Sequence, residues 1–199
     1  MDKYIEIKWH GKAGQGVGTA AQLCAEILAM EGKYVQAFPE FNVEKRPPAI
    51  KAYNRFSVTP IKQHTYVEEA DIVVIMEPSL ILNQEIGINI RPDAVFIVNT
   101  DYEPQYIKEK LNVSAGQIYT LDADTIAREE IGEPIPNIPM ISIIMQCIDW
   151  ISLEKLKEHL RQSLTEQLGE ESELVEANLA TIDRALNEVK FLDNTPLIE

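Results

Sequence analysis

A glycine-rich segment near the start of the chain constrains the fold more than any other feature of the sequence. Glycines stand at positions 11, 14, 16 and 18, within the sequence GKAGQGVG. Residues 4–9, before them, alternate polar and apolar side chains as a strand does, and apolar residues after position 16 recur at helical spacing up to Gly32. The sequence therefore predicts a strand that passes through a glycine loop directly into a helix.

Further strands and helices alternate along the chain. Apolar segments predict five more strands, at residues 33–38, 49–58, 71–76, 93–99 and 117–121. Helices are expected at 78–90 and at 123–131, the latter with Asp122 as N-cap, and an apolar segment, 140–150, precedes two amphipathic helices at 153–168 and 172–190. This order predicts an α/β fold: a three-layer, doubly wound, mostly parallel sheet with a C-terminal helical extension. We expect a single domain over residues 1–199, made of an α/β core (1–134) and a mainly helical extension (135–199).

The composition excludes several classes of function. The 199 residues carry a net charge of −14, divided into +3 over residues 1–62 and −17 over residues 63–199, which argues against nucleic acid as a partner. Cys24 and Cys147 are far apart in sequence, so this chain by itself is not expected to hold a disulfide framework, a zinc ion or an iron–sulfur cluster. The sequence shows neither a secretory signal nor a membrane-spanning segment, and we expect a cytoplasmic protein.

The glycine loop is the leading candidate for a binding site. Glycine permits positive φ and removes the Cβ atom, so backbone N–H groups at the start of a helix could converge on a phosphate, where the helix dipole is also favourable. The loop is not a Walker loop, because no Lys-Ser/Thr pair follows its last glycine, and it lacks the G-x-G-x-x-G spacing of a dinucleotide site. The alternative is that the glycines only permit a tight turn from strand to helix.

A second candidate is the basic pair Lys45-Arg46, which precedes Pro47-Pro48 in the loop between the second and third predicted strands. We expect this loop at the same carboxyl edge of the sheet as the glycine loop. Two adjacent cations next to prolines could pair with phosphates or with carboxylates of a partner, and the alternative is a solvated turn. The three histidines group neither with one another nor with a cysteine, so no catalytic or metal-binding set is proposed, and His10 is expected to be buried.

Four stretches of the sequence resemble one known family. They are IKWHGKAGQG at residues 7–16, GKYVQAFPE at 32–40, AYNR at 52–55 and PNIPM at 136–140. In this order and spacing they are similar to the gamma subunit, or the corresponding internal domain, of the 2-oxoacid:ferredoxin oxidoreductases of the pyruvate synthase type. The resemblance covers nearly the whole chain.

The resemblance implies a subunit without catalytic residues of its own. In this family, the alpha and beta subunits hold thiamine diphosphate with Mg²⁺. Partner subunits, including a ferredoxin-like delta subunit, contain [4Fe-4S] clusters that carry electrons to ferredoxin. The gamma domain covers the active site and helps to hold coenzyme A. The 2-oxoacid, most simply pyruvate, leaves as the acyl thioester and carbon dioxide. By analogy the expected coenzyme A contacts are Gly11, Lys12, Gly14, Gln15, Gly16, Gly18, Lys45 and Arg46.

One departure from the family leaves other functions open. Pyruvate-type relatives tend to have small residues after the basic pair, whereas this chain has Pro47-Pro48, whose rings add bulk where phosphates would approach. A relative that does not use coenzyme A, such as an oxalate oxidoreductase, therefore stays possible. Two further alternatives are a separate nucleotide- or coenzyme-binding module and a purely structural scaffold. The sequence does not identify the 2-oxoacid.

Overall fold

The computed structural model describes residues 4–40, 49–82, 86, 90–111, 116–169 and 172–193. Seven strands form one sheet in the order β2-β3-β1-β4-β5-β6-β7. Their bounds are β1 Ile5–Lys12, β2 Tyr34–Glu40, β3 Ala49–Ser57, β4 Ala70–Ile75, β5 Ile90–Asn99, β6 Gln117–Leu121 and β7 Lys190–Asp193. The helices are α1 Val17–Met30, η1 Pro78–Leu82 (a 3₁₀ helix), α2 Pro104–Leu111, α3 Ala123–Ile131, α4 Asn137–Ile148, α5 Leu153–Leu168 and α6 Glu173–Glu188.

The centre of the sheet is parallel and its borders are antiparallel. Strand β1 pairs in parallel with β4, β4 with β5, and β5 with β6. On one border β3 runs antiparallel to both β1 and β2, and on the other border β7 runs antiparallel to β6. The predicted α/β class is confirmed. The strand β7 and the helix α2 were not predicted from the sequence.

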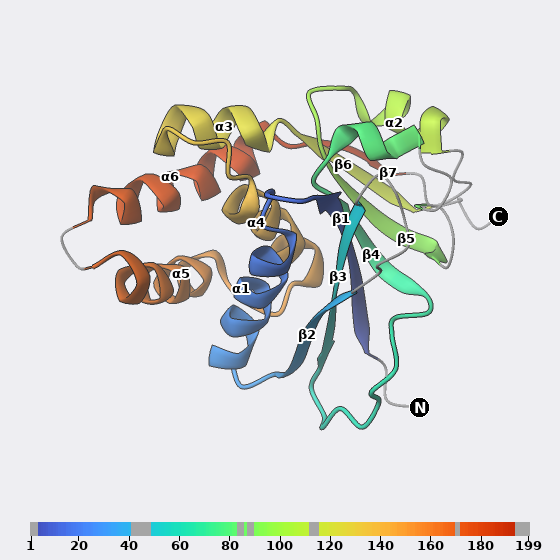
Figure 1. The fold of residues 1–199 in the computed structure, drawn as a ribbon, viewed down its shortest axis with the longest axis horizontal. Coiled ribbons are helices and arrows are strands. Elements are labelled where there is room, and N and C mark those ends of the chain that lie inside the picture. Colours follow the sequence, from blue (N-terminus) through green and yellow to red (C-terminus); the bar gives the residue numbers. More distant parts are fainter. Residues whose placement is uncertain are drawn as a thin grey trace.

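Helices cover both faces of the sheet, which gives three layers (Figure 1). On one face, α1, α3, α4, α5 and α6 pack over a core that contains Trp9, Phe56 and Ile144. On the other face, η1 and α2 cover a smaller core through Leu80, Ile81 and other apolar side chains. Helix α4 is the most buried helix, with ten of its twelve residues buried, because it lies beside the sheet and under α6. In the described part of the chain, no helix combines the length and the apolar character needed to cross a membrane.

Buried polar side chains hold the β1–β3–β2 border together. Arg55 on β3, which is fully buried, makes an ion pair with Glu6 on β1 at 2.6 Å and donates to the Gln36 side chain on β2 at 2.9 Å and to the Thr65 carbonyl at 3.1 Å. On the opposite face of β3, Asn54 accepts a hydrogen bond from the Trp9 indole and donates to the Ala21 carbonyl of α1. Two residues of the AYNR stretch therefore stabilise the fold by satisfying buried polar groups.

Some predicted boundaries were wrong. Residues 78–90 were expected to form one helix, but the structure has the short 3₁₀ helix η1, and β5 already begins at Ile90 rather than at position 93. The apolar segment expected at 140–150 belongs to a helix that starts earlier, since α4 begins at Asn137 and its third position is Pro139. Proline is tolerated there because the first turn of a helix has no intrahelical acceptor for its N–H groups. The predicted N-cap at Asp122 is confirmed, with its carboxylate accepting from Thr125 N at 3.0 Å.

Gly116, just before β6, allows a direct test of the packing of the sheet. Its φ is 106°, and a Cβ atom there would lie 1.9 Å from the Ala94 carbonyl oxygen. We expect Gly116→Ala to lower the free energy of unfolding by at least about 3 kcal/mol, since the backbone strain and the forced shift of β5 add together. Urea denaturation followed by circular dichroism measures the loss.

Gly132→Ala is the matched control for this prediction. Gly132 also has a left-handed φ, 83°, but a Cβ atom there would meet nothing within 4 Å. Backbone strain alone should cost about 1–2 kcal/mol. Equal losses in the two variants would show that the close approach of Gly116 to β5 is unimportant.

Candidate functional site

The glycine loop joins the carboxyl end of the central strand β1 to the amino end of α1 (Figure 1). Gly14 and Gly16 have φ of 88° and 69°, a left-handed conformation that other residues rarely adopt. Gly16 is the N-cap of α1 and offers no side-chain cap, and the first turn of α1 contains no acidic residue. The N–H groups at the start of α1 therefore have no side-chain acceptor at the cap position, which is the arrangement that receives anions at helix N-termini.

Not all of the glycines are needed for the same reason. A Cβ at Gly11 would lie 2.5 Å from Val17 Cγ2, so this glycine is required by packing. Gly18 is different, because its φ is not in the left-handed range and a Cβ there would meet nothing within 4 Å. Glycine inside a helix costs about 1 kcal/mol relative to alanine. The fold by itself does not account for Gly18, and its open surface fits the close approach of another molecule.

The polar side chains of the loop are bound to one another. Gln15 Oε1 accepts from Lys12 N at 2.8 Å, and Gln15 Nε2 donates to Glu77 Oε2 at 2.9 Å. Lys12 Nζ lies 3.0 Å from Glu77 Oε1. Lys12 and Gln15 thus lie at the loop, as the sequence analysis placed them, but both are held by Glu77. This carboxylate offsets the charge that Lys12 would offer to an anion.

Glu77 is a residue that sequence reasoning missed. It directly follows β4, and its place at the carboxyl end of a buried parallel strand is the signal that could have found it. Burial acts to raise the pKa of Glu77, but the hydrogen bonds from Ser79 and Lys12, together with the charge of Lys12, outweigh burial and lower the pKa below its usual 4.5. Glu77 is therefore ionised at neutral pH and belongs structurally to the loop.

Strand β5, the neighbour of β4 in the sheet, also ends in a hydrogen-bonded polar side chain. Asn99, at the end of β5, donates to the Met76 carbonyl at 3.0 Å and accepts from Ala123 N at 2.9 Å. Together with the Asp122 cap, this satisfies the N-terminus of α3 from within the fold. Burial is the main cause that raises the pKa of Asp124, in the first turn of α3. The start of α3 is thus closed to ligands in a way that the start of α1 is not.

Asn137, the first residue of α4, completes the surroundings of the loop. A Cβ at Gly16 would lie 3.1 Å from its Nδ2 atom. The N-terminus of α4 also has no side-chain cap and no acidic residue in its first turn. Two helix N-termini without caps therefore lie next to each other at the carboxyl edge of the sheet.

The second predicted contact set, Lys45 and Arg46, lies outside the described residues, as does Pro47-Pro48. The two ends of that loop are described. Ala49 pairs with Lys12 and Glu40 pairs with Lys51, so both ends of the loop are anchored at the edge of the sheet that carries the glycine loop.

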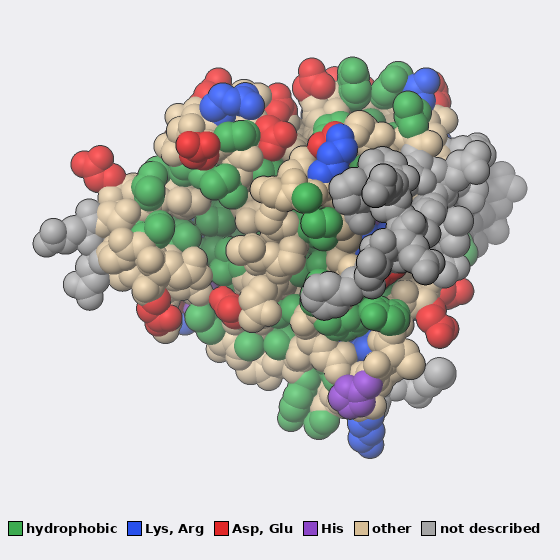
Figure 2. Space-filling model, viewed as in Figure 1, with side chains coloured by type: hydrophobic (Ala, Val, Ile, Leu, Met, Phe, Trp, Pro, Cys, Tyr) green, Lys and Arg blue, Asp and Glu red, His purple; other side chains and the backbone are tan. Residues whose placement is uncertain are grey.

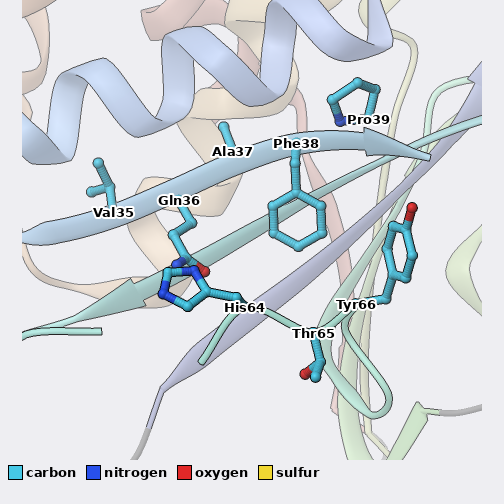
Figure 3. Close-up of a pocket in the computed structure, with 8 residues that line it drawn as sticks. All are labelled: Val35, Gln36, Ala37, Phe38, Pro39, His64, Thr65 and Tyr66. Atoms are coloured by element: carbon cyan, nitrogen blue, oxygen red, sulfur yellow. The ribbon is translucent and has the colours of Figure 1, made fainter. Parts of the chain in front are cut away.

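Other candidate features are not part of the glycine loop itself. His10 is 2% exposed, as expected for a buried residue. Among the described residues, no three His, Cys, Asp or Glu side chains are grouped in a way that could hold a metal ion. A groove of about 720 Å³ follows β2, at the border of the sheet, between residues 35–39 and 64–66 (Figure 3). Phe38 and Tyr66 lie side by side in its lining, with ring centroids 6.0 Å apart and ring planes tilted by 54°. None of the residues that line this groove belongs to a helix N-terminus, so the groove is distinct from the glycine loop.

Together the fold and the loop define a doubly wound α/β protein that presents an uncapped helix N-terminus behind glycines at the carboxyl edge of a parallel sheet. The chain belongs to the pyruvate ferredoxin/flavodoxin oxidoreductase family, whose model matches residues 6–188. Within this family it is a gamma subunit of a 2-oxoacid:ferredoxin oxidoreductase, one component of an oxidoreductase complex. The family resemblance seen in the sequence is confirmed.

The relatives agree in length and in fold. The chain is 36% identical to the pyruvate/ketoisovalerate oxidoreductases common subunit gamma of Pyrococcus abyssi, over 84% of this chain and 91% of that protein. It is 34% identical to the pyruvate synthase subunit PorC of Thermotoga maritima, over 94% and 96% of the two chains. The crystal structure of the pyruvate oxidoreductase subunit PorC of Thermotoga maritima superposes with a TM-score of 0.80 at 33% identity, covering 96% of this chain and 99% of that one.

The lowered pKa of Glu77 predicts how the loop responds to acid. A carboxyl whose pKa is depressed by folding contributes stability above its unfolded value, here 4.5, and loses that contribution as the pH falls through the folded value. We expect Glu77→Gln to lower the free energy of unfolding by about 1 kcal/mol at pH 7. The difference from the wild type should shrink as the pH falls below 4.5. Urea denaturation at several pH values measures it.

Glu68→Gln is the control, because Glu68 is exposed in the segment before β4 and makes no ion pair within the described residues. Its free energy of unfolding should follow that of the wild type at each pH. A Glu77→Gln difference that grows toward acid would contradict the assignment of Glu77 as an ionised partner of Lys12.

Proposed function

We propose that this chain is the gamma subunit of a thiamine diphosphate-dependent complex that converts pyruvate, coenzyme A and oxidised ferredoxin to acetyl-CoA, carbon dioxide and reduced ferredoxin. In this proposal the carboxyl edge of the sheet caps an active site formed by alpha and beta subunits, and the glycine loop contributes to binding coenzyme A. Thiamine diphosphate, Mg²⁺ and [4Fe-4S] clusters reside in partner subunits, including a ferredoxin-like delta subunit, and the complex is cytoplasmic.

The observation that carries the proposed ligand site is the open N-terminus of α1. It combines an uncapped Gly16 with Gly18, whose missing side chain the fold does not require. Coenzyme A offers a diphosphate and a phosphate monoester, the groups that helix N-termini bind through backbone N–H groups. Gly11, Gly14 and Gly16 shape the loop, while Lys12, Gln15, Lys45 and Arg46 are the side chains proposed to contact the ligand. The fold also occurs in a 2-oxoglutarate:ferredoxin oxidoreductase from Magnetococcus marinus that was solved with coenzyme A bound, and at 19% identity this likeness is one of fold.

The capping role is supported by exposed apolar side chains near the same edge. Leu82 at the end of η1, Tyr102 after β5 and Ile135 before α4 are 75%, 52% and 49% exposed. The ring of Tyr102 also packs against that of Tyr106, with centroids 4.8 Å apart and planes tilted by 48°, and Figure 2 shows hydrophobic side chains over the region of α2. Groups of solvent-exposed aromatic and aliphatic side chains are typical of surfaces that contact another subunit.

A second candidate function is that of a relative that does not use coenzyme A, such as an oxalate oxidoreductase. It is favoured by the Glu77 carboxylate, which is fixed against Lys12 and weakens the attraction of the loop for phosphate. Activity of the complex, isolated with this chain, on pyruvate, 2-oxoglutarate, a branched 2-oxoacid and oxalate, each with and without coenzyme A, separates the two. Turnover of oxalate without coenzyme A would replace the first proposal with the second. Recovery of the chain without any partner subunit would favour a separate coenzyme-binding module.

Gly18→Ala tests the coenzyme A contact. The variant should be more stable by about 0.5–1 kcal/mol, because alanine favours the helix and its Cβ meets nothing in the fold. The KM for coenzyme A should rise about tenfold, a loss of about 1.4 kcal/mol of binding, because the new methyl group covers the surface where the ligand approaches. Steady-state kinetics of the complex measures this, with the KM for the 2-oxoacid as internal reference.

Gln22→Ala is the matched control, since Gln22 is exposed one turn further along the same face of α1. It should leave the KM for coenzyme A unchanged. An unchanged KM in Gly18→Ala as well would remove coenzyme A from this surface, whatever the activity of the complex.

A further inference from the structure

Asn137 is a buried amide whose hydrogen bonding the fold does not complete. Asn137 is 8% exposed. Its Oδ1 atom is fully buried and has no hydrogen-bond partner in the described part of the chain. Buried polar atoms are nearly always paired, so this exception needs a cause.

The other buried asparagines show what a structural role looks like here. Asn54 accepts from the Trp9 indole at 2.7 Å and donates to the Ala21 carbonyl at 2.8 Å. Asn99 accepts from Ala123 N and donates to the Met76 carbonyl. Both amides have their oxygen and nitrogen occupied within the fold. Asn137 does not follow this pattern, although it is buried on a helix that packs at the centre of the structure.

The position of Asn137 points to a ligand at the glycine loop. Its amide lies against Gly16, where a Cβ would be 3.1 Å from Nδ2 and 3.5 Å from Oδ1. Around this amide, α1 and α4 both begin without a side-chain cap and without an acidic residue in the first turn. Two positive helix ends and a side-chain amide therefore meet at one point.

We propose that Asn137 is a binding residue for the anionic group that the glycine loop receives, and that this group is a phosphate ester. The inference rests on the proposed ligand site at the glycine loop. Rotation of the amide by 180° exchanges Oδ1 and Nδ2, and which atom takes which place follows from the hydrogen bonds on offer. In the free protein, both atoms lie close to Gly16 at the start of α1, and Nδ2 is the nearer of the two. When a phosphate binds, the NH₂ group donates to it beside the N–H groups of α1, directly or after this rotation.

Four variants of the full chain separate this role from a structural one. Asn137→Leu removes the amide but keeps a similar volume. Asn137→Asp places a carboxylate where the phosphate would bind. Asn99→Leu is the structural comparison, because it removes an amide whose two polar atoms are bonded. Asn178→Asp is the charge control, since Asn178 lies on α6 and its amide donates to the Leu174 carbonyl.

Isothermal titration calorimetry with coenzyme A and with inorganic pyrophosphate gives the affinities, and urea denaturation gives the stabilities. Asn137→Leu should weaken binding of both probes about tenfold or more while the free energy of unfolding stays equal or rises. Asn137→Asp should weaken it further, Asn178→Asp should bind as the wild type does, and Asn99→Leu should unfold more easily.

The outcomes distinguish this inference from the proposed function. If the wild type binds pyrophosphate but not coenzyme A, and Asn137→Leu loses that binding, the phosphate role of Asn137 stands and the coenzyme A proposal fails. If the wild type binds coenzyme A and the Asn137 variants bind it equally well, only the present inference is overturned. Binding of neither probe by the wild type overturns both. A loss of stability in Asn137→Leu as large as that in Asn99→Leu would also overturn the inference, because the amide would then be structural.

Discussion

The left-handed backbone at Gly16 is the constraint on which the rest of the structure depends. Its φ of 69° turns the chain from β1, at the middle of the sheet, into α1, which covers one face. The same residue leaves room for Asn137, where the buried helix α4 begins. A side chain at this position would strain the backbone of the turn and would also crowd Asn137 at the start of α4. The absence of a Cβ atom at Gly16 thus sets the positions of β1, α1 and α4 relative to one another.

The helix N-termini at the carboxyl edge of the sheet differ in whether side chains cap them. At α3, Asp122 and Asn99 satisfy the first N–H groups from within the chain. At α1 and α4 no side chain takes that role. The charge of Lys12 is offset by its ion pair with Glu77. Among the described residues, the helix dipoles at the starts of α1 and α4 therefore attract an anion more than the Lys12 side chain does. In the proposed role, such a site would recognise the phosphate groups of coenzyme A mainly by shape and backbone geometry.

Most of the fold could be predicted from the sequence because its signals are local. Apolar runs at the centre of the sheet, the glycine loop and the Asp122 cap each occupy a few neighbouring residues. What was missed depends on contacts between distant segments. Strand β7, Lys190–Asp193, is a strand only because it pairs with β6, and α2 has only eight residues, of which two are buried. The antiparallel direction of β3 is likewise a matter of pairing, since its sequence does not distinguish one direction from the other.

For the candidate site, the sequence alone located the glycine loop, the family and the carboxyl edge, because glycines and short motifs can be read along the chain. It could not separate Gly11, needed for packing against Val17, from Gly18, which the fold does not require, because that difference lies in what surrounds each missing Cβ. The sequence also did not single out Glu77, although the end of a buried strand marks its position, or Asn137; both reach the loop from distant segments, after β4 and at the start of α4. Only the tertiary structure decided these, since an ion pair, a buried unpaired oxygen and the meeting of two helix ends arise between segments far apart in sequence.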